Sequence, residues 1–131
     1  PEEYIPDADE RVLIYRKVAF AEEVEDVGAL ASEVEAAHPG MPAAAANFFE
    51  RARVRALAHA MHVHTVSVVA GKLNIEPVAA PTGDVAARLR RAKARYVKQT
   101  RKLQVPLKFF DLGEDDSLLE AVYALLRDLK G

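Results

Sequence analysis

Hydrophobic residues in the first half of the chain recur at the spacing of amphipathic helices. Asp7 and Glu10 have the three-residue spacing of an N-cap and its capping partner, which predicts a helix from there to about Phe20. A second helix is predicted over residues 22–38, and a third over residues 42–62, where a proline leads an alanine-rich segment. The third segment has two apolar faces, so we expect it to be packed on both sides.

In the second half of the chain the hydrophobic period changes to two, which is typical of strands buried on one side. This pattern predicts a β-hairpin over residues 65–77, with its turn at Ala70-Gly71. Thr82 opens a further predicted helix, whose apolar positions recur as far as Tyr96. The hydrophobic pattern thus predicts both helices and strands in this half.

Weaker strand patterns follow over residues 96–98 and 103–107, and a last helix is predicted to begin at the acidic residues 114–116. The element order is ααα-ββ-α-ββ-α. It predicts an α+β fold in which an N-terminal three-helix layer packs on a small, mostly antiparallel sheet. We expect residues 1–131 to form a single domain, and the missing initiator methionine suggests a piece of a longer protein.

The composition narrows the class of protein. Half of the 131 residues are apolar, which is typical of a globular domain, and the net charge of -2 gives no strong overall attraction to nucleic acid or anionic lipid. The chain has no cysteine, which excludes disulfides and thiolate metal sites. No apolar run is long enough to span a membrane and no signal peptide is recognisable, so we expect no membrane partner and a cytoplasmic location.

Charges are strongly segregated along the chain. Residues 1–37 contain eleven acidic and three basic residues, whereas residues 88–102 contain eight basic residues and no acid. On the second predicted helix, Glu22, Asp26 and Glu33 lie together on the side opposite the valines. On the fourth, the positions opposite the apolar stripe are Arg88, Arg91 and Arg95. These two faces are candidate contact surfaces, and two ordinary solvated faces are the alternative.

The sequence offers little for catalysis. It contains no phosphate-binding glycine loop and no nucleophile elbow, and its carboxylates form no recognisable catalytic pair. His59, His62 and His64 form the one metal-like cluster, but no fourth ligand lies nearby in sequence. Partly exposed histidines near a helix end are the alternative. We therefore predict no catalytic residue, cofactor or metal ligand.

Several short motifs together resemble a known family. The whole chain is similar to the C-terminal domain of the bacterial transcription-repair coupling factor, Mfd. The motifs that carry this resemblance are Tyr4-Ile5-Pro6-Asp7, Arg11, Tyr15-Arg16-Lys17-Val18-Ala19, Met41-Pro42, Asn47-Phe48-Phe49 and Ala52-Arg53-Val54-Arg55. Residues 36–39 depart from it, because the family usually carries an Asp-Arg-Phe-Gly-type turn there.

The resemblance implies a regulatory function. The full family protein is an ATP-dependent DNA translocase that displaces stalled RNA polymerase and recruits nucleotide-excision repair, so ATP and Mg²⁺ would belong to the parent protein's motor. Its C-terminal domain packs on the N-terminal repair-protein-like module and masks the surface that recruits UvrA. The present chain would then be a non-enzymatic, autoinhibitory domain.

Two hypotheses about contact residues follow. In the first, Glu22, Asp26 and Glu33 meet basic residues of the N-terminal module, since opposite charges orient docking. In the alternative, the basic segment 88–102 contacts DNA phosphates. We favour the first, with DNA contact through this domain as the lesser alternative.

Overall fold

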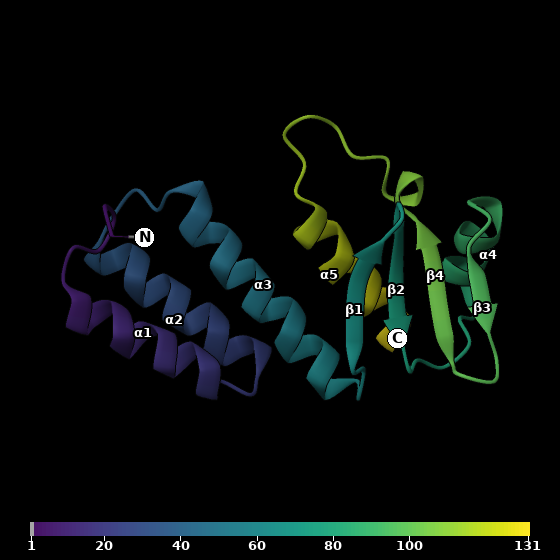
Figure 1. The fold of residues 1–131 in the computed structure, drawn as a ribbon, viewed down its shortest axis with the longest axis horizontal. Coiled ribbons are helices and arrows are strands. Elements are labelled where there is room, and N and C mark those ends of the chain that lie inside the picture. Colours follow the sequence, from purple (N-terminus) through teal and green to yellow (C-terminus); the bar gives the residue numbers. More distant parts are fainter. Residues whose placement is uncertain (1) are drawn as a thin grey trace. The chain divides into compact units, whose positions relative to one another are not determined.

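The computed structural model describes residues 2–131 and contains five α-helices, four strands and a short 3-10 helix (Figure 1). Their order confirms the predicted α+β class and the order ααα-ββ-α-ββ-α. By its internal contacts the chain divides into two compact units, one extending to Leu57 and the other covering Ala58–Gly131. The assignment of the whole chain to a single domain stays a prediction.

The first unit contains α1 (Ala8–Phe20), α2 (Val24–Ala37) and most of α3 (Ala43–Ala60). Asp7 is the N-cap of α1, as predicted, and its Oδ1 accepts the backbone N–H groups of Asp9 at 2.9 Å and Glu10 at 3.3 Å. Glu10 does not return a capping bond, because its carboxylate contacts His38 instead.

The second helix is shorter than predicted. It begins at Val24 rather than at residue 22, because Glu23 has the extended backbone of an N-cap and the preceding residues form the connection from α1. The third helix ends at Ala60, where the next turn is closed by a hydrogen bond from the Val63 N–H to the Ala58 carbonyl. His62 follows in the left-handed conformation, with φ of 60°, which stops the helix.

A single hydrophobic core holds the first unit together. All three helices and the segment before α1 contribute to it, and Val27 on α2 has no exposed surface. The predicted apolar side of α2 is confirmed, because both Val27 and Val34 are buried. The buried members of the core are Ile5, Val18, Val27, Val34, Phe49, Ala52 and Ala56.

The second unit is built on one antiparallel sheet of four strands in the order β1-β2-β4-β3. The strands are β1 (Thr65–Val69), β2 (Lys72–Glu76), β3 (Arg95–Val97) and β4 (Lys102–Pro106). The predicted hairpin and both weaker strands are therefore confirmed. Ile75 on β2 lies opposite Val66 on one side and Leu103 on the other, which joins the two hairpins into a single sheet.

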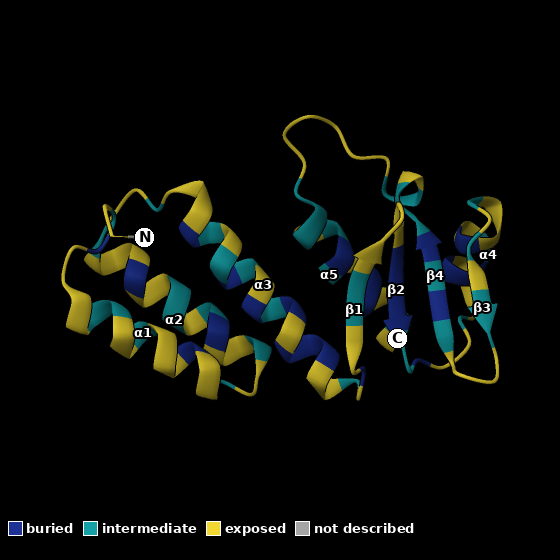
Figure 2. Cartoon of the chain, in the orientation of Figure 1, coloured by how far each residue is buried: buried dark blue, intermediate teal, exposed yellow. Residues whose placement is uncertain are grey.

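Two helices cover one face of this sheet, α4 (Gly83–Arg91) and α5 (Leu118–Lys130), and a 3-10 helix (Leu107–Phe110) follows β4 (Figure 1). The central strands β2 and β4 carry much of the buried surface (Figure 2). Their apolar residues Leu73, Ile75, Leu103 and Val105 alternate along the strands and so share a face. The buried residues of the two helices are Val85, Ala86 and Leu89 on α4 and Val122, Leu125 and Leu126 on α5.

The fourth helix ends earlier than its apolar pattern predicts. Lys93 adopts a left-handed conformation with φ of 63°, and the Ala94 N–H bonds the Leu89 carbonyl, which closes the helix after Arg91. The prediction that the helical pattern reaches Tyr96 is therefore wrong, and Tyr96 lies in β3. The last helix begins after Ser117, whose hydroxyl accepts the Glu120 N–H, so the acidic residues 114–116 precede its cap.

The β1–β2 turn holds a strained residue. Both Ala70 and Gly71 have positive φ, at 52° and 76°, as a two-residue turn between antiparallel strands requires. Glycine tolerates this conformation, whereas alanine is strained there. We expect Ala70→Gly to raise the free energy of unfolding by about 0.5–1 kcal/mol, measured by urea denaturation. Ala36→Gly, in the exposed last turn of α2, is the control and should instead lower it.

Candidate docking surface

An open groove runs between α1 and α2 in the first unit. It has a volume of 590 Å³, and four positions of each helix line it at the spacing i, i+3, i+4 and i+7. This spacing keeps one face of each helix turned toward the groove. The lining residues are Leu13, Arg16, Lys17, Phe20, Ala21, Asp26, Ala29, Leu30 and Glu33. We call this feature the α1–α2 groove.

The groove exposes large apolar side chains. Phe20, in the last turn of α1, is 81% exposed, and Leu13, two turns earlier, is 52% exposed. Full burial of an exposed side chain of this size gains roughly 1.5–3 kcal/mol, and a side chain that is already half covered, such as Leu13, would gain about half of that. Apolar side chains that gather in a groove rimmed by charge are typical of surfaces that bind another protein.

The two walls of the groove carry opposite charges. Arg16 and Lys17 lie on the α1 wall, while Asp26 and Glu33 lie on the α2 wall. Within residues 2–131, neither acid forms an ion pair with a basic side chain at 4.0 Å or less. Both carboxylates are exposed and so are available to a basic partner.

The structure brings together only part of the predicted acidic face. Asp26 and Glu33 share the groove, but Glu22 lies in the connection before α2 and does not line it. The prediction that all three lie on one side of a helix is therefore wrong for Glu22, because the helix begins two residues later. Sequence reasoning missed Leu13 and Phe20, although their seven-residue separation on a predicted helix could have indicated a shared face.

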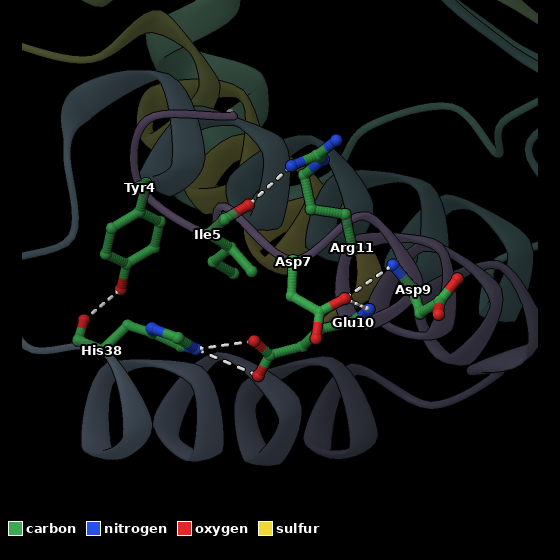
Figure 3. A network of polar contacts seen from close by, with 7 residues as sticks. All are labelled: Tyr4, Ile5, Asp7, Asp9, Glu10, Arg11 and His38. Atoms are coloured by element: carbon green, nitrogen blue, oxygen red, sulfur yellow. Dashed lines mark hydrogen bonds and ion pairs between the residues drawn. The ribbon is translucent and has the colours of Figure 1, made fainter.

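A network of polar contacts fixes the ends of these helices (Figure 3). The Tyr4 hydroxyl donates to the His38 carbonyl, and His38 Nε2 lies 3.0 Å from both carboxylate oxygens of Glu10. Arg11 Nη1 donates to the Ile5 carbonyl at 2.7 Å, which anchors the segment before α1. His38 belongs to residues 36–39, where the chain departs from the expected family turn, so a local polar contact holds the turn here.

Tyr4 gives this network a dependence on alkaline pH. Partial burial, and then the negative charge of Glu35, raise the pKa of the Tyr4 hydroxyl above its ordinary 10.0. The folded state therefore keeps this proton at a pH where the unfolded chain releases it, so the contribution to stability is complete below pH 10 and is lost as the pH rises through the folded pKa.

We expect Tyr4→Phe to remove this dependence. The variant should lose about 1 kcal/mol of unfolding free energy at neutral pH, because the hydrogen bond to His38 is absent. The gap to the wild type should then narrow as the pH rises above 10.0, measured by urea denaturation at successive pH values. Parallel curves for the two proteins over this range would contradict the assignment.

The predicted basic face is divided between two elements. Arg88 and Arg91 lie on α4, but Arg95 lies on β3, because the helix has already ended. The prediction that the three share one helix side is therefore wrong. Arg88 is also partnered, since its Nη2 lies 2.8 Å from Asp128 Oδ2 on α5.

The three histidines near the end of α3 do not form a metal centre in the structure. His59 lies in the last turn of α3, His62 and His64 follow it, and all three are exposed. Residues 2–131 contain no group of three or more histidine, aspartate or glutamate side chains placed to hold a metal ion. No helix among these residues is long and apolar enough to cross a membrane.

Comparison with known proteins decides the family. The sequence profile of the TRCF domain matches residues 1–87, which is well over half of the chain. The chain belongs to the TRCF domain family. The matched residues of this TRCF domain include α1, α2 and therefore the whole α1–α2 groove.

A solved structure confirms the fold of the TRCF domain. The crystal structure of the C-terminal domain of transcription-repair coupling factor superposes with a TM-score of 0.72 and 19% sequence identity, covering 99% of this chain and 84% of that one. No curated protein sequence matches the chain. The family match and the shared fold together confirm the resemblance to the C-terminal domain of transcription-repair coupling factor.

Proposed function

We propose that this TRCF domain is a regulatory, autoinhibitory domain that docks onto the N-terminal repair-protein-like module of its own parent protein. In the docked state it masks the surface that recruits UvrA. The parent would be an ATP-dependent DNA translocase of the bacterial cytoplasm, with ATP and Mg²⁺ bound by its motor, that displaces stalled RNA polymerase. This domain would carry no catalytic residue.

The α1–α2 groove is the observation that carries this proposal. Its α2 wall presents Asp26 and Glu33 without basic partners among residues 2–131, beside the exposed ring of Phe20. A partner with a basic rim and an apolar ridge would satisfy both features. Mixed surfaces of this kind bind reversibly, because the exposed charges steer association more than they add to affinity. Reversible contact is what an autoinhibitory domain requires.

The charges of the groove also set the orientation of a partner. Arg16 and Lys17 line the α1 wall. A partner bound in the reverse orientation would therefore bring its basic rim against these two cations instead of against the acids of α2. Like charges placed opposite each other disfavour that arrangement. The groove therefore supports one docking orientation, which a masking contact needs if it is to cover a particular surface.

The test of docking is a binding titration of this chain against the isolated N-terminal module of the same protein. We expect saturable binding that weakens as salt is added, because exposed charge pairs are screened within about 10 Å at 0.1 M ionic strength. Binding that does not respond to salt would contradict the role of the charged walls, and absence of binding at low salt would contradict docking itself.

A further inference from the structure

A second, basic hollow lies in the other compact unit. It is formed at the C-terminal end of α4 and the 3-10 helix and has a volume of 410 Å³. Three of its five lining residues are cationic and none is acidic. The lining residues are Arg88, Arg91, Ala92, Lys108 and Phe109, and we call this feature the basic hollow.

Arg88 is held in place at the edge of this hollow. Its Nη2 lies 2.8 Å from Asp128 Oδ2, and its Cζ lies 5.8 Å from the centroid of the Phe109 ring. The ring contact limits the freedom of the guanidinium, so less conformational entropy is lost when it binds an anion. The Asp128 carboxylate already pairs with Arg88, and a negatively charged group of a ligand can take its place beside the guanidinium.

The other two cations are available for a ligand. Arg91 and Lys108 are exposed, and neither forms an ion pair with an acidic side chain within residues 2–131. Phe109 belongs to the same lining, and its side chain is only half-buried. The hollow therefore combines positive charge with part of an aromatic ring.

We propose that the basic hollow binds single-stranded nucleic acid. Guanidinium and ammonium groups contact its phosphates, and Phe109 lies against a base. Planar guanidinium groups match the geometry of phosphate, and cations beside an aromatic ring are typical of surfaces that bind single strands. An acidic peptide would use the same cations, but it has no base for the ring to stack on.

This site does not depend on the proposed docking function. The basic hollow is lined by the end of α4 and by the 3-10 helix, whereas the α1–α2 groove lies in the other unit. Variants of one surface leave the other intact, so failure of either proposal can be told from failure of the other.

The test is fluorescence anisotropy of the full chain with a labelled mixed-sequence DNA strand of about 12 nucleotides, titrated at several salt concentrations. Arg91→Gln with Lys108→Gln should weaken binding on the order of tenfold at low salt. It should also reduce the slope of log affinity against log salt by about 1.4, since each lost phosphate contact removes about 0.7 for a single strand. The matched control is Arg51→Gln with Arg55→Gln, which removes the same charge from exposed positions of α3 outside the hollow and should change affinity by less than about twofold.

A second variant is expected to strengthen binding. A gain in affinity cannot result from a loss of folding, so this variant tests the site itself. Asp128→Asn removes the competing carboxylate from Arg88 and should strengthen binding by about threefold. Asp115→Asn makes the same change of charge in the loop before α5 and should have little effect. Equal gains in both variants would show that only overall charge matters, and would overturn the proposal.

Three other outcomes would overturn it. The first is no binding of the strand at low salt. The second is equal affinity for a duplex of the same sequence, because stacking on Phe109 needs an unpaired base. The third is equally tight binding of a polyglutamate peptide with the same response to the variants, which would make the hollow a site for acidic peptides.

Discussion

Replacing Asp26 and Glu33 together by lysine is expected to weaken docking onto the N-terminal module on the order of 10- to 100-fold. Each substitution removes an attraction to a basic partner and adds a repulsion in the α1–α2 groove. Most of the loss should appear in the association rate, since rim charges act mainly on diffusional encounter. The measurement is biosensor kinetics against the immobilised module at low and high salt.

The control for this variant carries the same change of charge outside the groove. Glu3→Lys with Glu25→Lys alters two exposed acids of the first unit that do not line the groove. Glu25 lies in the first turn of α2, as Asp26 does, so a lysine at either position has a similar effect on the helix dipole. Equal losses in both double variants would contradict a role for the groove and leave only general attraction between the two proteins.

Leu126→Ala is expected to lower the free energy of unfolding by about 2–5 kcal/mol. Leu126 has no exposed surface, and it lies on α5 beside the buried Leu125 and one turn from the buried Val122. Truncation loses burial of the side chain and leaves a cavity that the surrounding residues fill only in part. The measurement is urea denaturation followed by far-ultraviolet circular dichroism.

Leu112→Ala provides the comparison for this substitution. Leu112 is 40% exposed and lies in the segment before α5, so the same truncation there should cost less than about 1 kcal/mol. A loss of that small size at Leu126 would contradict tight packing of α5 in the second unit.

Local chemistry made much of the fold predictable. The carboxylate of Asp7 caps α1 through the next two to three residues, so the signal lies within a few positions of sequence. The turn at Ala70-Gly71 likewise depends on a glycine at a position that requires positive φ. Elements defined by such short-range features could be placed from the sequence.

Other features depend on backbone conformations that no residue pattern in the sequence indicates. The end of α4 is set by the left-handed backbone of Lys93, a residue type with no preference for that conformation, so the apolar pattern appeared to reach Tyr96. For the same reason Arg95 lies on β3 and not on the helix that carries Arg88 and Arg91. Phe109, which lines the basic hollow beside Arg88, lies outside the basic segment and reaches it only in the folded chain.

The acidic side chains of the α1–α2 groove can be found from the sequence, whereas its apolar side chains cannot. Asp26 and Glu33 were recognised from their spacing on one helix. Leu13 and Phe20 were not, because their exposure becomes meaningful only when α1 lies beside α2 and the two faces form one groove. Helix periodicity tells which residues share a face, but it does not tell which faces remain uncovered.

The most direct test of the central claim is a competition between this chain and UvrA for the isolated N-terminal module. With the chain bound near saturation, increasing UvrA should displace it fully, and the apparent affinity of UvrA should fall in proportion to the concentration of the chain. A complex that holds the module, the chain and UvrA together would contradict masking, because the two partners would then occupy separate surfaces.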